Sequence, residues 1–255
     1  MTFNFFEILV LSAIQGISEF IPVSSSAHLF LISDIYNLNT KSLLTDIGLH
    51  LGSLLAIITY FWSDLVNIFK NKNLLSLIIV GSIPVIFIGA IIYQTNFISY
   101  LRNIEIIAWT SLVFAILLYF ADKVEPKRTL NTKLNIKTII IIGCFQVLAL
   151  IPGVSRSGIV ITISRFLSFN RYDSTKISFY LSIPVIAGAS FLGLKDLYNE
   201  SINFNSMILL SVFLSYIFSF FTIKYFLIFV KKFDLKIFVL YRILLSVLLF
   251  SIIYF

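Results

Sequence analysis

The segment Gln15–His28, QGISEFIPVSSSAH, places a carboxylate, a histidine and three consecutive serines inside a stretch that is otherwise rich in Ile, Leu, Phe and Ala. Gln15 and Glu19 are four residues apart, so a helix would carry them on one face. Ser25 and His28 are three apart and would meet if a helix restarts after the proline. A carboxylate, a hydroxyl and an imidazole together are suited to acid–base and nucleophilic chemistry.

A second polar segment, PGVSRSG, starts at Pro152 and contains Arg156. Its Ser and Gly residues can turn hydroxyls and backbone N–H groups inward, and a helix that starts there adds the positive end of its dipole. An arginine, hydroxyls and a helix N-terminus favour a phosphate ligand. With Glu19 and His28 beside that phosphate, phosphoryl transfer or hydrolysis is favoured over binding alone.

Composition indicates where this chemistry takes place. The 255 residues are 59% hydrophobic and 12% charged, whereas soluble proteins are roughly 45–50% apolar and about 25% charged. The apolar runs are continuous and not alternating, which favours membrane helices over a β-barrel. A single cysteine excludes an internal disulfide, and membrane loops explain the net charge of +7 better than nucleic-acid binding does. We therefore expect an all-α integral membrane protein with residues 1–255 as a single polytopic domain.

Six apolar runs are long enough to predict transmembrane helices, and two further apolar regions, 5–33 and 137–167, are each interrupted by proline, serine and glycine. Proline breaks a helix and leaves polar groups that hydrocarbon cannot satisfy, so each interrupted region is predicted to form a re-entrant helical hairpin with a buried tip. The six predicted spans are Leu49–Trp62, Leu74–Gln94, Glu105–Phe120, Ser174–Leu194, Met207–Val230 and Ile237–Phe255.

The charge distribution predicts the orientation. With residue 1 outside, the inside loops would carry thirteen lysines and arginines and the outside loops three. This follows the positive-inside rule and places both termini outside the cell. The inside loops are 63–74, 122–137, 165–176 and 231–236, and the outside loops are 34–48, 95–104 and 195–206.

The two interrupted regions resemble each other at an offset of 131 residues, at which Gln15 matches Gln146, Ser24 matches Ser155 and Ser26 matches Ser157. Paired interrupted segments are typical of inverted-topology repeats that hold a site at the repeat interface. The predicted halves are about 1–121 and 137–255, joined by a cytoplasmic loop at 122–136. Chance matching between isoleucine-rich segments is the alternative explanation.

Both segments also resemble the signature segments of the bacitracin-resistance undecaprenyl-diphosphate phosphatases, which read like (E/Q)GxxEFxPVSSxGH and PGxSRSG. The resemblance extends over essentially the whole chain, including GLHLGSLLAIITYFW and the YR near the C-terminus. It implies hydrolysis of a C55 lipid diphosphate to the monophosphate carrier used for peptidoglycan and other envelope glycans. It also implies an inverted repeat with two re-entrant hairpins, an extracytoplasmic site in the bacterial cell (inner) membrane, and bacitracin tolerance.

Matching the motifs residue by residue places the family's functional Glu, Ser, His and Arg on Glu19, Ser25, His28 and Arg156. We expect Arg156 to clamp the diphosphate and Glu19 to act as general base or to hold a divalent cation, Mg²⁺ or Ca²⁺. Ser25 is the candidate nucleophile, with direct attack by water as the alternative, and His28 either orients Ser25 or protonates the leaving lipid phosphate. Further phosphate contacts are expected from Ser24, Ser26, Ser155 and Ser157, with Gln15, Gly153 and Gly158 in support.

This chain departs from the family pattern at three positions. Gln15 stands where some members carry a glutamate, which weakens a two-carboxylate metal site. Ala27 replaces the usual glycine, which matters if that backbone needs a positive φ. Val160 stands where many members have a threonine, and Thr162 is the nearest substitute.

A different function stays open, because inverted repeats with broken helices also build transporters, and a lipid-phosphate flippase would use the same arginine and hydroxyls. Glu19 beside Ser25 and His28 favours the hydrolase. The expected partners are a polyprenyl diphosphate lipid and the membrane, with no organic cofactor and no nucleic acid, and a homodimer is open. Two other charges within apolar segments, Lys224 and Arg242, are expected to pair with interface groups or lipid headgroups.

Overall fold

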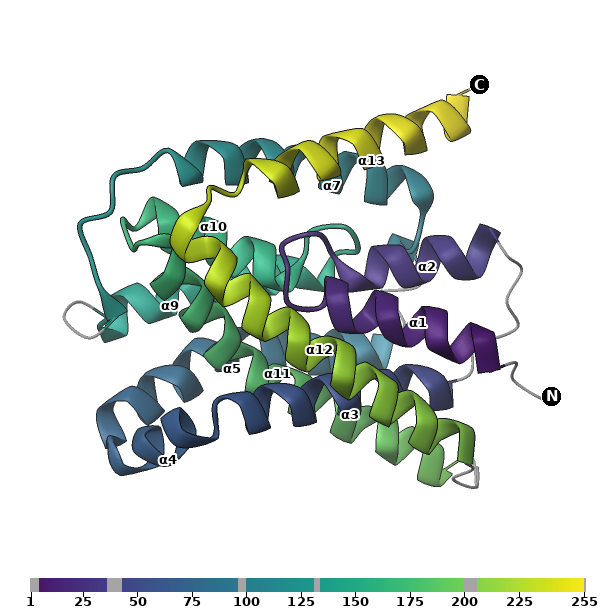
Figure 1. Cartoon of the computed structure of the whole chain (residues 1–255), viewed down its shortest axis with the longest axis horizontal. Helices are drawn as coiled ribbons and strands as arrows, with labels where there is room; N and C mark the ends of the chain where they lie inside the picture. The colour runs from purple at the N-terminus through teal and green to yellow at the C-terminus, as the bar shows by residue number, and fades with distance from the viewer. Residues whose placement is uncertain (1–4, 36–42, 96–99, 131–133, 200–205, 255) are drawn as a thin grey trace.

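A computed structural model of the chain describes residues 5–35, 43–95, 100–130, 134–199 and 206–254. Within these ranges the protein forms eleven α-helices and one 3-10 helix (Figure 1). The helices are α1 (Phe5–Ser18), α2 (Ser25–Ile35), α3 (Leu43–Tyr60), α4 (Trp62–Lys70), α5 (Lys72–Thr95), α7 (Ile104–Asp122), α9 (Ile136–Gln146), η1 (Val147–Leu150), α10 (Arg156–Phe166), α11 (Arg171–Asn199), α12 (Ser206–Lys232) and α13 (Lys236–Tyr254). The predicted outside loops lie partly beyond the described ranges, as does part of the 122–136 connector.

The long apolar helices confirm a multi-pass membrane protein. Five described helices, α5, α7, α11, α12 and α13, are long and apolar enough to cross a membrane. The first predicted span, Leu49–Trp62, is short for a membrane helix, and as expected it begins a few residues earlier, as α3 at Leu43. It bends by 74° into α4, so the bent pair makes a sixth span if it crosses as one unit. Large apolar side chains such as Phe87 and Leu209 face outward, which suits a hydrocarbon solvent.

Both predicted helix breaks are present. Helix α1 ends at Ser18 and α2 starts at Ser25, while α9 gives way to η1 and α10 starts at Arg156. Helix α1 packs on α2 and α9 on α10, so each broken region forms a helical hairpin. In Figure 1 the α1–α2 turn lies in the middle of the molecule, whereas the first turn of α1 and the end of α2 lie near the edge where α13 ends.

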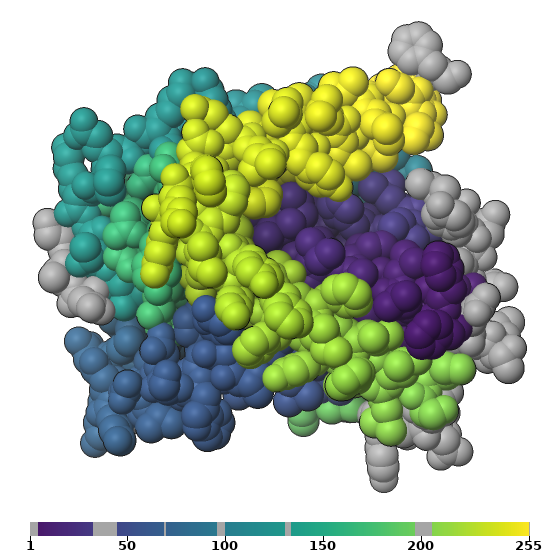
Figure 2. All heavy atoms as spheres, in the orientation of Figure 1, coloured from purple at the N-terminus to yellow at the C-terminus, as the bar shows by residue number. Residues whose placement is uncertain are grey.

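Helix α12 holds the α1–α2 hairpin against the rest of the bundle. It packs on both α1 and α3, and Figure 2 shows it crossing one face diagonally with α1 and α2 visible between α12 and α13. Small polar side chains line the contact with α3: Ser53 Oγ lies 3.2 Å from Ser215 Oγ and 3.0 Å from Ser219 Oγ, and Ser215 Oγ donates to the Leu49 carbonyl at 2.7 Å. Such residues let helix backbones approach closely in a membrane.

A second close approach joins α9 to α5 at two glycines. A Cβ added at Gly143 would collide with the backbone carbonyl of Gly81. A backbone group cannot avoid the collision by changing rotamer. We therefore expect the Gly143→Ala variant to lose about 1–3 kcal/mol of stability through overpacking and to unfold several degrees lower in detergent. The control is Gly188→Ala on α11, where an added Cβ meets no atom within 4 Å. Equal melting temperatures for the two variants would contradict this packing.

Candidate active site

The two hairpin turns meet, as the matching sequence segments predict. Ser157 Oγ at the start of α10 donates to the Ile21 carbonyl in the α1–α2 turn at 2.7 Å. Arg156 Nη2 lies 3.4 Å from the Glu19 carbonyl oxygen of the same turn. Residues 136 and 137 positions apart are thus brought into one polar cluster by two broken helices.

The Glu19 carboxylate is the centre of this cluster. Its Oε1 accepts from Arg156 Nη2 at 2.9 Å, and its Oε2 accepts from Ser25 Oγ at 2.6 Å and from Gln15 Nε2 at 3.0 Å. The side chains of Glu19 and Arg156 are only 8% and 10% exposed, so water screens their attraction weakly. The structure therefore joins three of the four predicted catalytic residues, and the predicted Gln15–Glu19 contact is confirmed.

Ser25 lies at the first position of α2, where the chain restarts its helix after Pro22. The preceding residue, Ser24, has a φ of 82°, a left-handed conformation that turns the backbone sharply into the helix. The turn directs the half-buried Ser25 hydroxyl at Glu19 while keeping it at a helix N-terminus. Ala27 lies inside α2 and has no positive φ, so the replacement of the family glycine puts no strain on this backbone.

Arg156 occupies the equivalent position on α10. Ser155 caps this helix with a φ of 71°, and its hydroxyl accepts from the Gly158 amide at 3.1 Å. Arg156 Nη1 is buried and has no hydrogen-bond partner among the described residues. An unpaired guanidinium nitrogen beside a helix N-terminus is a ready donor for a phosphate oxygen.

The remaining predicted serines pair within their own turns: Ser24 Oγ lies 3.3 Å from Ser26 Oγ, and Ser155 Oγ lies 3.2 Å from Ser157 Oγ. Gly153 has a φ of 88°, and a Cβ there would also collide with Thr110 Oγ1, so this turn requires glycine. The hydroxyl of Thr162 donates back to the Gly158 carbonyl at 2.7 Å within α10, so in this structure it does not replace the missing family threonine.

The hydrogen bonds of His28 in the described structure go to groups other than Ser25, contrary to the hypothesis that His28 orients this hydroxyl. Its Nδ1 lies 2.6 Å from the Ser24 carbonyl oxygen, which can only accept, so Nδ1 carries a proton. Its Nε2 lies 2.5 Å from the Tyr241 hydroxyl, and the two rings stack with centroids 5.6 Å apart. Both ring nitrogens are occupied, and the group that accepts from Ser25 is Glu19.

Sequence reasoning also missed the role of Arg242, which does not face lipid headgroups. It is 1% exposed in the second turn of α13. Within the described residues its guanidinium donates to backbone carbonyls, which come from both hairpin turns and from α7. These contacts run from Nη1 to Pro22 (3.3 Å) and Val154 (3.1 Å), from Nη2 to Gly153 (2.8 Å) and Thr110 (3.4 Å), and from Nε to Ser111 (3.3 Å). The signal in the sequence was a charge in the middle of an otherwise apolar span.

The fold is that of a multi-pass membrane protein, and the polar cluster where its two helical hairpins meet has the donors and the carboxylate that an enzyme acting on phosphate groups would need. Residues 8–248 match the family model described as bacitracin resistance protein BacA, and the chain belongs to this family.

Its curated relatives match along almost their whole length. The chain is 53% identical over 252 residues to an undecaprenyl-diphosphatase of Pelagibacter ubique, with 98% of each chain covered. It is 39% identical over 250 residues to the undecaprenyl-diphosphatase of Elusimicrobium minutum (94% of this chain, 95% of the relative) and 38% identical over 259 residues to that of Saccharophagus degradans (96% and 97%).

The contacts of Arg242 generate a prediction about stability. Arg242→Met removes the donor to five buried carbonyls while keeping an apolar side chain, so the protein is expected to lose about 3–5 kcal/mol and to unfold at a clearly lower temperature. Lys224→Met on α12 is the matched control, because Lys224 is exposed. Thermal unfolding of the two variants in the same detergent checks this, and a melting temperature for Arg242→Met equal to that of the control would show that the carbonyls need no such donor.

Proposed function

We propose that this protein hydrolyses undecaprenyl diphosphate to undecaprenyl phosphate and inorganic phosphate, and so regenerates a lipid carrier for peptidoglycan and envelope glycan synthesis. The observation that carries the proposal is the Glu19–Ser25–Arg156 cluster, which joins a proton acceptor, a nucleophile and a phosphate-binding cation. The function of the curated relatives agrees with it. A carrier that only transports a lipid phosphate has no need of a hydroxyl hydrogen-bonded to a carboxylate.

In the proposed reaction the terminal phosphate of the substrate replaces the Glu19 carboxylate as the ion-pair partner of Arg156. Arg156 Nη1 and Nη2 bind its oxygens, and the N-termini of α2 and α10 add two positive dipole ends. Ser155 precedes Arg156 directly, and its hydroxyl is a further donor, whereas the predicted phosphate contact of Ser157 would require its hydroxyl to leave the Ile21 carbonyl. Positive charge from three sources then offsets the negative charge that phosphoryl transfer spreads over the equatorial oxygens.

Ser25 Oγ attacks the terminal phosphorus while its proton passes to Glu19 Oε2, 2.6 Å away. The bond between that phosphorus and the bridging oxygen breaks, and undecaprenyl phosphate leaves with the bridging oxygen. Glu19 then loses the serine proton to solvent and takes a proton from a water molecule as that water attacks the phosphoserine. The phosphorus–Oγ bond breaks, inorganic phosphate is released and the Ser25 hydroxyl is restored. Direct attack by a water that Glu19 activates is the competing route to the same products.

The contacts of His28 suit it to protonate the leaving lipid phosphate and not to activate the nucleophile Ser25. When both ring nitrogens are protonated, Nδ1 remains bonded to the Ser24 carbonyl and Nε2 carries the transferable proton. Tyr241 holds Nε2 until the lipid phosphate needs that proton. This division leaves Glu19 as base and His28 as acid.

A divalent cation fits this site only together with the substrate. Among the described residues no group of three or more His, Cys, Asp or Glu side chains could hold a metal ion. Mg²⁺ is commonly held by one or two carboxylates plus substrate phosphates, and Glu19 with the unpaired Oε1 of Gln15 offers such a partial ligand set. We therefore expect Mg²⁺ or Ca²⁺ to enter with the diphosphate if it takes part.

The arrangement of helices supports the inverted repeat. Helix α2 starts 131 residues before α10, and α7 starts 132 residues before α13. Under this correspondence the contact of α1 with α12 matches that of α9 with α5. The positive-inside rule supports a proposal in which both termini and the catalytic tips face the extracytoplasmic side. Labelling of a cysteine introduced at Glu125 from the cytoplasmic side only would agree with this orientation.

The function is tested by phosphate release from undecaprenyl diphosphate by purified protein in detergent, with and without chelator. Glu19→Gln and Arg156→Ala are each expected to lower kcat by about a thousandfold, because they remove the base and the phosphate clamp. Glu7→Gln on the same helix α1 is the carboxylate control and should retain full activity. A folded wild type that releases no phosphate would favour the transport function.

The covalent route makes a separate prediction. Rapid acid quenching with substrate labelled in its terminal phosphate should trap label on the wild-type protein and on Ser26→Ala, whose side chain is exposed, but not on Ser25→Ala. Direct water attack predicts instead that no variant carries label while Ser25→Ala keeps appreciable activity.

A further inference from the structure

A second charged pocket lies at the end of the bundle away from the hairpin tips. It has a volume of about 570 Å³ and lies between the end of α7, the α10–α11 connection and the end of α12. Its charged lining consists of Asp122, Lys123, Glu125, Arg165, Arg171 and Lys231. Four cations thus face two carboxylates.

This pocket is distinct from the catalytic cluster. Helix α10 carries Arg156 at its start and Arg165 nine residues later, so about 14 Å of helix separates the two at 1.5 Å per residue. None of the residues that line the pocket takes part in the Glu19–Ser25–Arg156 contacts.

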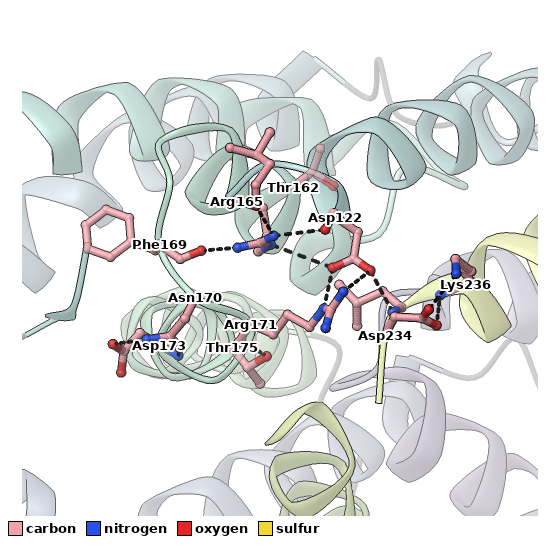
Figure 3. Close-up of polar contacts among 12 residues, drawn as sticks. Asp122, Thr162, Arg165, Phe169, Asn170, Arg171, Asp173, Thr175, Asp234 and Lys236 are labelled. Carbon is pink, nitrogen blue, oxygen red and sulfur yellow. Dashed lines mark hydrogen bonds and ion pairs between the residues drawn. The ribbon is translucent and has the colours of Figure 1, made fainter. Parts of the chain in front are cut away.

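The Asp122 carboxylate already forms ion pairs with Arg165 and Arg171, as Figure 3 shows. Arg171 binds it in a bidentate manner, with Nε 2.6 Å from Oδ1 and Nη2 3.0 Å from Oδ2, and the Leu235 amide donates to Oδ2 at 2.9 Å. Arg165 Nε lies 3.6 Å from Oδ1, while its other nitrogens donate to backbone carbonyls. Two guanidinium groups share one carboxylate, which leaves a net positive charge.

The lysines of the pocket have no carboxylate partner among the described residues. Lys123 lies over the Tyr119 ring at 4.1 Å and Lys231 over the Tyr172 ring at 4.4 Å, whereas Glu125 pairs with Lys127 at 3.8 Å. One further donor is available to a ligand oxygen. Arg165 Nε is buried and makes no hydrogen bond within the described residues, with Asp122 Oδ1 an ion-pair neighbour at 3.6 Å.

We infer that this pocket binds a phosphate group, supplied either by free phosphate or by the phosphomonoester headgroup of a lipid. A doubly charged phosphate with several acceptor oxygens matches the net charge of the arginine pair and the two lysines better than a single carboxylate does. Arg171 is also the first residue of the long helix α11, whose N-terminus adds a favourable dipole.

The experiment measures binding in an Arg156→Gln background, which weakens phosphate binding at the catalytic tips. One arm titrates inorganic phosphate into protein in detergent at constant ionic strength. The other compares retention of phosphatidic acid and phosphatidylcholine in nanodiscs by native mass spectrometry. Binding of phosphate, of phosphatidic acid over phosphatidylcholine, or of both supports the pocket and identifies the source of the phosphate group.

Charge-matched variants localise the site. Lys123→Gln combined with Lys231→Gln should weaken binding at least about tenfold, as expected for the loss of two charge-assisted contacts. Lys70→Gln combined with Lys72→Gln, two cations outside the pocket, should change it less than about twofold. No binding in the Arg156→Gln background, or equal weakening by both pairs, would overturn the inference. Because the readout is binding, a failure here is distinguishable from a lack of hydrolase activity.

Discussion

Everything at the catalytic site depends on how two interrupted helices satisfy their backbone carbonyls inside a membrane. A break at Pro22 or Pro152 frees carbonyl groups that hydrocarbon cannot solvate. Arg242 solves this for both turns at once, because a single guanidinium reaches Pro22 on one hairpin and Gly153 and Val154 on the other. Ser157 adds a direct link to Ile21. The two hairpins are therefore fixed relative to each other by backbone contacts, and the catalytic side chains inherit that geometry.

The same breaks supply the chemistry. A continuous helix has no free N-terminus within its length, whereas the two interrupted regions each provide one, at Ser25 and at Arg156. The left-handed residues Ser24 and Ser155 make both restarts possible, and each directly precedes a residue that we propose to act on substrate. Backbone strain at such positions costs of order 1–3 kcal/mol each. Here the strained turns direct the Ser25 hydroxyl and the Arg156 guanidinium at the Glu19 carboxylate. The strain and the orientation of these side chains therefore have the same structural origin.

The sequence predicted the parts of this site whose signal is local. Apolar run length predicted the spans, proline with serine and glycine predicted the breaks, and the four-residue spacing predicted the Gln15–Glu19 contact. The sequence did not predict which groups Arg242 contacts. Its partners are backbone carbonyls, which every residue has, so no side-chain type in the sequence indicates them. The His28–Tyr241 contact joins residues 213 positions apart. The contacts of Asp122 join the ends of α7 and α10, the start of α11 and Leu235 just before α13. Such contacts depend on how helices pack, which periodicity alone does not determine.

Helix α10 connects the two charged regions, and its anchoring explains why Arg156 is held so firmly. At its start Ser157 is bonded to the opposite hairpin, and at its end Arg165 donates to the carbonyls of Phe169, Asp122 and Val124. Most residues between are buried, so the helix cannot shift at one end without breaking contacts at the other. In the proposed reaction, rotation of the Arg156 side chain exchanges the Glu19 carboxylate for a substrate phosphate. Under that proposal the same motion frees Glu19 when phosphate binds, and so couples substrate binding to the release of the base proposed for Ser25.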